Sequence, residues 1–118
     1  MTYSQSTGVL RSNEGRWMGV GYSGNGAALN NPADETIHGH GPIPRGVWTL
    51  GAPTEEKGPL TFPLTPSDST KVFGRSGFLI HGDNSKLNLS ASEGCVVLGR
   101  SIRNAIALNG DSILEVIS

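Results

Sequence analysis

Cysteine is nearly absent from this chain: its 118 residues include one, Cys95. A single cysteine excludes an intrachain disulfide, so no covalent staple supports the fold. The thiol is therefore a buried filler, an intermolecular linker or a reactive group. In a small protein, a lone free cysteine is most often an inert buried side chain.

The sequence also lacks an excess of charge of one sign, because 9 Lys and Arg residues stand against 10 Asp and Glu residues. This balance provides no basic face for nucleic acid and no polybasic membrane anchor. No run approaches the ~18 apolar residues of a membrane span. The opening residues, MTYSQSTGVLRSNEG, lack the basic start and apolar stretch of a secretory signal. We therefore expect no nucleic-acid partner, no membrane span and no ordinary export signal.

Glycine and proline are present in quantity, with 17 and 7 residues spread along the chain. Short runs of Val, Ile, Leu and Thr lie between them, which is typical of a β-rich protein with many turns. The apolar share of 36% is enough for one core. The sequence therefore predicts one domain over residues 1–118.

The expected elements are mostly strands. Pro63 favours an edge strand or a bulge where it falls. The polar stretch 23–42 is long for a plain connection, so we expect it to line a functional site. The predicted strand regions are residues 2–10, 17–23, 43–50 (a turn leading into a strand), 59–65, 77–81 and 112–118.

One helix is predicted, over residues 100–110, because Ile102, Ala105 and Ile106 fall at helical spacing. Ser101 is expected to cap its start and Gly110 to end it. The sequence therefore predicts a mostly β fold, either a β-sandwich or a closed β structure, with one short helix after Cys95.

The segment HGDNSKLNLSASEGC places His81 and the only thiol at the two ends of a polar loop. A cysteine nucleophile needs a base and donors for the oxyanion. Histidine titrates near neutral pH, and His81 follows an apolar strand that fixes its ring. The backbone N–H groups around Gly94 and Cys95 are the expected oxyanion donors. The polar run before Cys95 makes a reactive thiol, with a depressed pKa, as good an interpretation as a buried filler.

These residues resemble the signature of L,D-transpeptidases with the YkuD-type catalytic domain. The signature is a strand ending in His-Gly, a loop, Ser/Thr-x-Gly-Cys and an apolar pair; here it comprises His81, Gly82, Ser92, Gly94, Cys95, Val96 and Val97. The segment GPIPRGVWTLG (residues 41–51) is similar to the turn and strand that precede the catalytic half in that family. The resemblance covers residues 41–103 and implies the β fold of that catalytic domain.

Three departures separate this chain from the exported members of the family. Glu93 stands where a second histidine is usual, Val97 stands where an arginine is usual, and the loop after His81 is short. The chain is more similar to the type VI secretion L,D-transpeptidase effectors and related phage-borne proteins. The departures leave open how the substrate carboxylates are held, with Arg75, Arg100 and His40 as the candidates.

For the other polar residues, a structural role is an alternative to a functional one. Ser92 either holds the loop by bonding backbone groups or is a plain turn serine. Asp83 either orients His81 or, as composition favours, caps the turn with Gly82. His38 and His40 lack nearby Cys, Asp or Glu partners, so neither a metal site nor a cofactor is predicted.

The resemblance implies peptidoglycan stem peptides as substrates, with Cys95 attacking the carbonyl between the third residue and D-Ala. Water, a free D-amino acid or a second stem peptide would be the acceptor, and the sequence leaves this choice open. An antibacterial effector of this kind acts in the periplasm of a target cell, delivered without its own signal peptide, and is met there by a cognate immunity protein. Two alternatives remain: a wall-binding module of a phage or secretion system, and a general cysteine peptidase.

Overall fold

The computed structural model describes all of residues 1–118 and shows nine short strands in one mixed sheet. The strand order is β3-β2-β1-β9-β5-β6-β7-β8-β4. One α-helix, α1 (Arg100–Asn109), follows the eighth strand. The strands are β1 (Thr2–Ser4), β2 (Val9–Arg11), β3 (Trp17–Val20), β4 (Tyr22–Ser23), β5 (Gly46–Leu50), β6 (Phe62–Pro66), β7 (Leu79–His81), β8 (Val96–Val97) and β9 (Ile113–Ile117).

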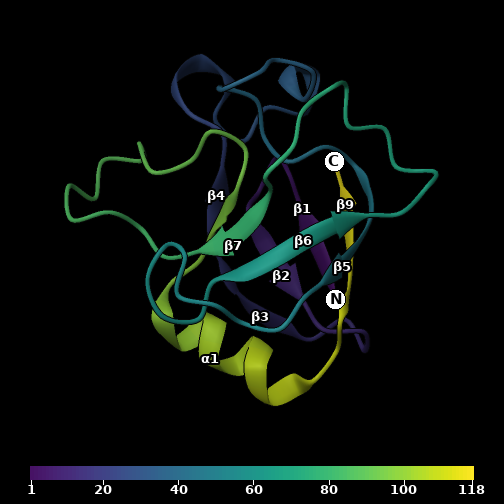
Figure 1. Ribbon diagram of the computed structural model, residues 1–118, viewed down its shortest axis with the longest axis vertical. Helices are drawn as coiled ribbons and strands as arrows, with labels where there is room; N and C mark the ends of the chain where they lie inside the picture. Colours follow the sequence, from purple (N-terminus) through teal and green to yellow (C-terminus); the bar gives the residue numbers. More distant parts are fainter.

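The sheet curls into a nearly closed, barrel-like structure (Figure 1). Its two outer strands, β3 and β4, are consecutive in the chain and are separated by Gly21 alone. A Cβ on Gly21 would lie 2.0 Å from the carbonyl oxygen of Val97, so glycine lets the backbone of β4 approach β8 closely. The predicted mostly β, closed structure is confirmed.

The predicted strands over residues 2–10 and 17–23 are each two strands instead. β1 and β2 form an antiparallel hairpin, and the chain turns at Gly8, whose φ is 72°. A Cβ on Gly8 would lie 2.0 Å from the Gly21 carbonyl oxygen. Both breaks therefore fall at glycines, which tolerate this conformation and this close approach.

Of the two alternatives predicted for Pro63, an edge strand or a bulge, the edge strand is wrong, because β6 lies between β5 and β7. Residues 64–66 of β6 pair with β5, whereas residues 62–63 pair with β7. Pro63 thus stands where the strand changes partner. The backbone hydrogen bonds on either side form although proline has no N–H. The Pro63 carbonyl accepts from Gly51 N–H at 2.8 Å, and Leu64 N–H donates to the Phe78 carbonyl at 3.0 Å.

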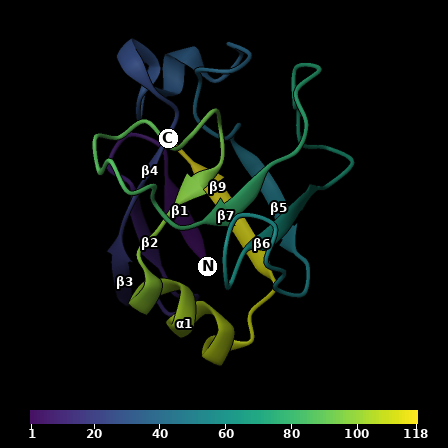
Figure 2. The same cartoon turned by 60° about the vertical axis from the view of Figure 1, so that its left-hand side comes forward.

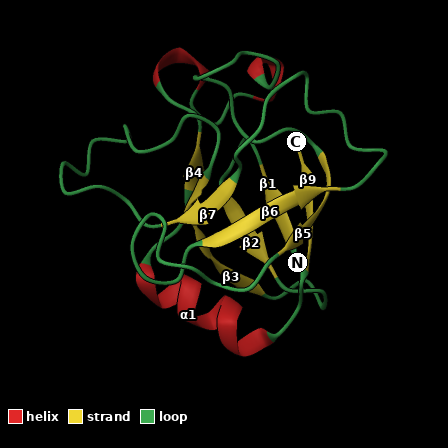
Figure 3. Ribbon diagram, viewed as in Figure 1, coloured by secondary structure: helices red, strands yellow, loops and turns green.

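The helix α1 covers one end of the curled sheet (Figures 2 and 3). Gly110 ends it in the left-handed conformation, as predicted, with a φ of 74°. The predicted cap by Ser101 is wrong: Gly99 is the N-cap residue, and no side chain bonds the first turn. Ile106 is buried in the core and Ile102 packs against it, so the apolar face of α1 faces the sheet.

One cluster of buried side chains fills the interior and joins both halves of the sheet. Trp48 of β5 and Phe78, just before β7, meet edge to face with ring centroids 5.0 Å apart. Trp48 is fully buried and donates its indole N–H to the Pro44 carbonyl. This contact fixes the start of β7 against the core. No helix has the length and apolar character needed to cross a membrane.

Candidate active site

A cavity of about 510 Å³ lies where β7 and β8 begin, near the surface loops, and both His81 and Cys95 line it. The complete lining is His38, Gly39, Lys57, Gly74, Arg75, Ser76, Gly77, Phe78, Leu79, His81, Ser90, Ala91, Glu93, Gly94 and Cys95.

Strand pairing explains why two residues fourteen positions apart share this cavity. β7 and β8 are parallel neighbours, with Ile80 opposite Val96 and His81 opposite Val97. Cys95 directly precedes Val96 and so continues this register opposite Leu79. Side chains two positions apart on a strand point to the same face. The thiol and the imidazole therefore emerge on one side of the sheet.

His81 is buried, with 5% of its surface exposed, and a backbone oxygen orients its ring. Nδ1 lies 2.7 Å from the carbonyl oxygen of Gly82. Because a carbonyl only accepts, Nδ1 carries the proton in this contact. Nε2 of the neutral ring then holds the lone pair and is free to take a proton. His81 thus has the tautomer that a general base requires.

The Cys95 thiol is half-buried, and its environment differs from the expected one. Burial raises the pKa of Cys95, while the Leu79 N–H and the Lys57 charge lower it. The charges of Glu56 and Glu93 act in the raising direction. The expected depressed pKa is therefore wrong, because loss of hydration outweighs the favourable groups. The free protein holds a thiol, with Sγ 3.7 Å from the Gly77 carbonyl oxygen.

Ser92 ties the nucleophile loop together by bonding backbone groups. Its hydroxyl is fully buried and donates to the Cys95 carbonyl at 2.6 Å. The same oxygen accepts from Gly24 N–H at 2.9 Å and from Gly94 N–H at 3.1 Å. The Gly94 N–H, an expected oxyanion donor, is thus already used. The Cys95 N–H donates to no group of the chain and is the remaining donor at this position.

A buried arginine packs behind each of the two motif glycines. A Cβ on Gly94 would lie 2.4 Å from Nη2 of Arg75, and a Cβ on Gly82 would lie 2.6 Å from Nη2 of Arg103. Gly94 also has a φ of 136°, which side chains rarely allow. Glycine is therefore required at both positions by the close approach of a guanidinium.

Arg75 clamps three loops around the cysteine. Its Nη1 donates to the carbonyls of Glu35 and Pro42, and its Nη2 donates to those of Gly41 and Glu93. The guanidinium also lies over the Phe78 ring, 5.1 Å from the centroid. Burial lowers the pKa of Arg75. These bonds occupy the amino groups that a substrate carboxylate would use, so the structure shows Arg75 as an organiser of the cavity wall.

Arg103 is a second buried arginine that bonds backbone carbonyls. It is 8% exposed, and it donates Nε–H to the Leu98 carbonyl at 2.9 Å and Nη1–H to the Pro59 carbonyl at 2.6 Å. Burial lowers its pKa. Arg103 thereby connects α1, the turn before β6 and the backbone just after His81.

Asp83 does not contact His81. Its carboxylate accepts from the Tyr22 hydroxyl at 2.7 Å and from Asn84 N–H at 2.9 Å, which agrees with the turn role that composition favoured. The Tyr22 oxygen accepts in turn from Ala91 N–H at 3.1 Å. Burial and the Asp83 bond raise the pKa of Tyr22 to about 12. Tyr22 thus joins the two ends of the loop between His81 and Cys95.

The other two candidates for holding carboxylates lie outside the cavity. His40 is exposed and its Nδ1 contacts Oδ1 of Asn25 at 2.7 Å. Asn25 donates to the Ser92 carbonyl at 2.7 Å, so His40 reaches the nucleophile loop only through Asn25. Arg100 is exposed at the start of α1 and does not line the cavity.

Sequence reasoning missed four residues of this site: Tyr22, His38, Lys57 and Arg103. His38 lines the cavity as part of the long polar stretch that was expected to border a site. Arg103 stands three positions before buried Ile106 on the helix, so helical spacing was a usable signal for its burial. Nothing around Lys57 in the sequence marks it. No three His, Cys, Asp or Glu side chains gather in a way that would hold a metal ion.

Comparison with known proteins identifies the family of this chain. A family model, the Tlde1 domain, matches residues 18–113, which is most of the chain and includes every residue that lines the cavity. No curated protein and no solved structure matches the chain. The predicted effector branch is thereby supported. The chain belongs to the Tlde1 domain family, the family of type VI L,D-transpeptidase effectors.

Proposed function

We propose that this protein is a cysteine-dependent enzyme that cleaves or exchanges the terminal D-Ala of peptidoglycan stem tetrapeptides. The observation that supports this proposal is that Cys95 and His81 line the same cavity, with Nδ1 of His81 held by the Gly82 carbonyl so that Nε2 is left to act as a base. Family membership supports a peptidoglycan-modifying effector. The identity of the nucleophile rests on the geometry.

The first half of the reaction forms a thioester. His81 Nε2 takes the thiol proton as Sγ of Cys95 attacks the carbonyl carbon between the third residue and D-Ala. The Cys95 N–H is placed to donate to the oxyanion. The C–N bond then breaks, the proton on His81 passes to the leaving amine, and D-Ala departs.

The second half releases the acyl group. An acceptor loses a proton to His81 and attacks the thioester carbonyl, and the thiol of Cys95 leaves and regains the proton. Water gives L,D-carboxypeptidase activity, a D-amino acid gives exchange, and a second stem peptide gives a 3→3 crosslink. The cavity is bordered by surface loops and is open to small acceptors, which favours hydrolysis and exchange.

A raised thiol pKa defines the role of His81. Burial raises the pKa of the Cys95 thiol, so in the proposed reaction proton removal accompanies attack, as with a serine nucleophile. His81 is accordingly a general base in the attack itself. As an effector, the enzyme would act in the periplasm of a target cell by trimming or capping the donor stem peptides that this cell needs. A cognate immunity protein would protect the producer.

Incubation with purified tetrapeptide muropeptides tests this proposal. The wild-type protein should release D-Ala, or exchange it for an added D-amino acid, and the products are read by mass spectrometry. The Cys95→Ala and His81→Ala variants should lose at least about 10²-fold in rate while remaining folded by circular dichroism. Wild-type rates in either folded variant would refute the assignment.

Expression in two compartments separates the alternatives. With a periplasmic signal the protein should lyse cells, and Cys95→Ala should abolish this; in the cytoplasm it should be harmless because mature stem peptides are absent there. A wall-binding module would act equally with or without Cys95. Cysteine-dependent toxicity in both compartments would indicate a general cysteine peptidase.

A further inference from the structure

Lys57 is the one cationic side chain of the cavity lining that is not engaged elsewhere. The two ion pairs of the structure involve Arg45 and the first residue of the chain, so Lys57 is not part of either. Arg75 is committed to four carbonyls. The remaining basic side chains of the lining are two histidines: His38 contacts the Phe73 carbonyl through Nε2, and His81 contacts the Gly82 carbonyl through Nδ1.

The backbone under Lys57 is held firmly. Its N–H donates to Oγ1 of Thr61, which is fully buried and donates in turn to the Gly58 carbonyl at 2.8 Å. Thr54 and Thr61 pair across this turn. Arg103 fixes the following residues by donating to the Pro59 carbonyl. The ammonium group therefore extends from a rigid base toward the cavity.

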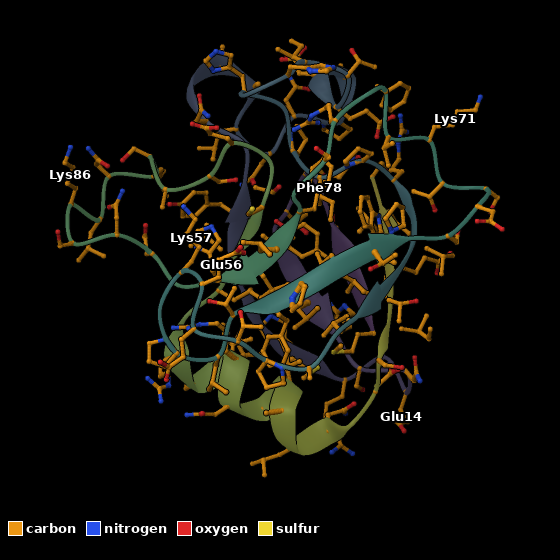
Figure 4. All side chains as sticks on the ribbon, in the orientation of Figure 1. Glu14, Glu56, Lys57, Lys71, Phe78 and Lys86 are labelled. Atoms are coloured by element: carbon orange, nitrogen blue, oxygen red, sulfur yellow. The ribbon has the colours of Figure 1, made fainter.

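The position of Lys57 relative to His81 gives it a specific role. Figure 4 shows Lys57 beside β7, the strand that ends at His81. In the proposed reaction His81 protonates the leaving amine, so the leaving residue must lie at this side of the cavity. The carboxylate of a terminal amino acid is only two bonds from its nitrogen. A cation next to the proton donor is therefore next to that carboxylate.

The surrounding charges make such a cation necessary. Glu56 and Glu93 place negative charge close enough to Cys95 to act on its ionisation. An incoming carboxylate would be repelled by the same two groups. The Lys57 ammonium offsets this repulsion and favours a free carboxylate over a neutral end.

We propose that Lys57 binds the free carboxylate of the residue that leaves and thereby restricts the enzyme to stem peptides whose scissile bond is followed by one terminal amino acid. This inference rests on the proposed function. Peptides extended or amidated after the scissile bond lack the carboxylate at this place, and the enzyme should process them poorly.

The test compares a tetrapeptide with its C-terminal amide. The wild-type protein should prefer the acid by about 10- to 10²-fold in kcat/KM, as expected for a charged hydrogen bond. Lys57→Met should lower activity on the acid much more than activity on the amide, so that the preference for the acid is lost, and Lys57→Arg should restore part of the preference. Lys71→Met and Lys86→Met make the same charge change on exposed loops that point away from β7 (Figure 4) and should behave as wild type.

Binding to proteins that carry Cys95→Ala separates this inference from the proposed function. Calorimetry should show that Lys57→Met weakens binding of the acid about tenfold or more and leaves binding of the amide unchanged. If the acid binds through Lys57 but the wild-type protein does not turn it over, the proposed reaction fails and the carboxylate site stands. If the acid is turned over and Lys57→Met keeps the full acid preference, the carboxylate site fails and the reaction stands. Absence of both binding and turnover overturns both.

Discussion

Arg75 lies directly behind Gly94, so close that a Cβ on Gly94 would come within 2.4 Å of the guanidinium Nη2. Gly94, the residue before the nucleophile, and Arg75, a buried cation from another loop, are therefore packed directly against each other. The missing side chain of Gly94 leaves room for Arg75. Arg75 in turn donates a hydrogen bond to the carbonyl of Glu93, the residue that precedes Gly94.

Gly94→Ala should destabilise the protein by about 1–3 kcal/mol, because the new Cβ meets Arg75 and a φ of 136° strains any side chain. Urea denaturation measures the change, and muropeptide turnover should fall with it. Gly99→Ala is the matched control, since Gly99 has a φ of −63° and open space around its Cα. Equal stabilities for the two variants would contradict the account of Gly94.

Arg75→Met should lower the free energy of unfolding by roughly 3 kcal/mol, because it leaves several buried carbonyls without donors. The same substitution at exposed Arg100, which does not line the cavity, should change both stability and kcat/KM little. Thermal and urea unfolding provide the comparison. A stable Arg75→Met protein with a raised KM alone would show that Arg75 binds substrate rather than organising loops.

Tyr22→Phe should change the pH dependence of stability. The pKa of Tyr22 is raised to about 12 in the folded protein, against about 10 in an unfolded chain. The folded state therefore holds this proton more tightly, and its contribution is complete below pH 10 and lost as the pH rises from about 10 to 12. The wild-type free energy of unfolding should fall more steeply across this window than that of Tyr22→Phe. Parallel curves would contradict the assignment.

Much of this architecture could be predicted from local pattern. Helical spacing located α1, and Gly110 marked its end; His81 at the end of an apolar run was placed correctly on β7. The two short hairpin strands within residues 2–10 were missed because the break at Gly8 depends on contact with Gly21, thirteen residues away. Pro63 was misjudged because a change of strand partner is a property of the sheet, which one strand does not reveal.

The site was predicted where its chemistry is local and missed where it is not. Cys95, His81 and Ser92 share a motif that can be found by eye. The burial of Arg75 and Arg103 depends on loops that meet only in the fold, so Arg75 was taken as a free cation and Arg103 was passed over. The thiol pKa was predicted in the wrong direction because hydration is lost through neighbours distant in sequence.

The alkylation rate of Cys95 should follow its raised pKa. A raised pKa keeps the thiol protonated to higher pH, so iodoacetamide should react slowly at pH 7 and progressively faster as the pH rises past the usual thiol range. His81→Ala should change this profile little, because no stable thiolate–imidazolium pair exists to be lost. A rate that is already maximal near pH 7 and collapses in His81→Ala would show a stored ion pair instead.

The most direct test of Cys95 as the nucleophile is the intact mass of the protein after brief mixing with a tetrapeptide muropeptide and acid quenching. The wild-type protein should gain the mass of the substrate minus D-Ala, and peptide mapping should place the adduct on Cys95 as a thioester that hydroxylamine removes. Cys95→Ala should show no adduct. Release of D-Ala by a folded Cys95→Ala protein, or an adduct on another residue, would contradict the account.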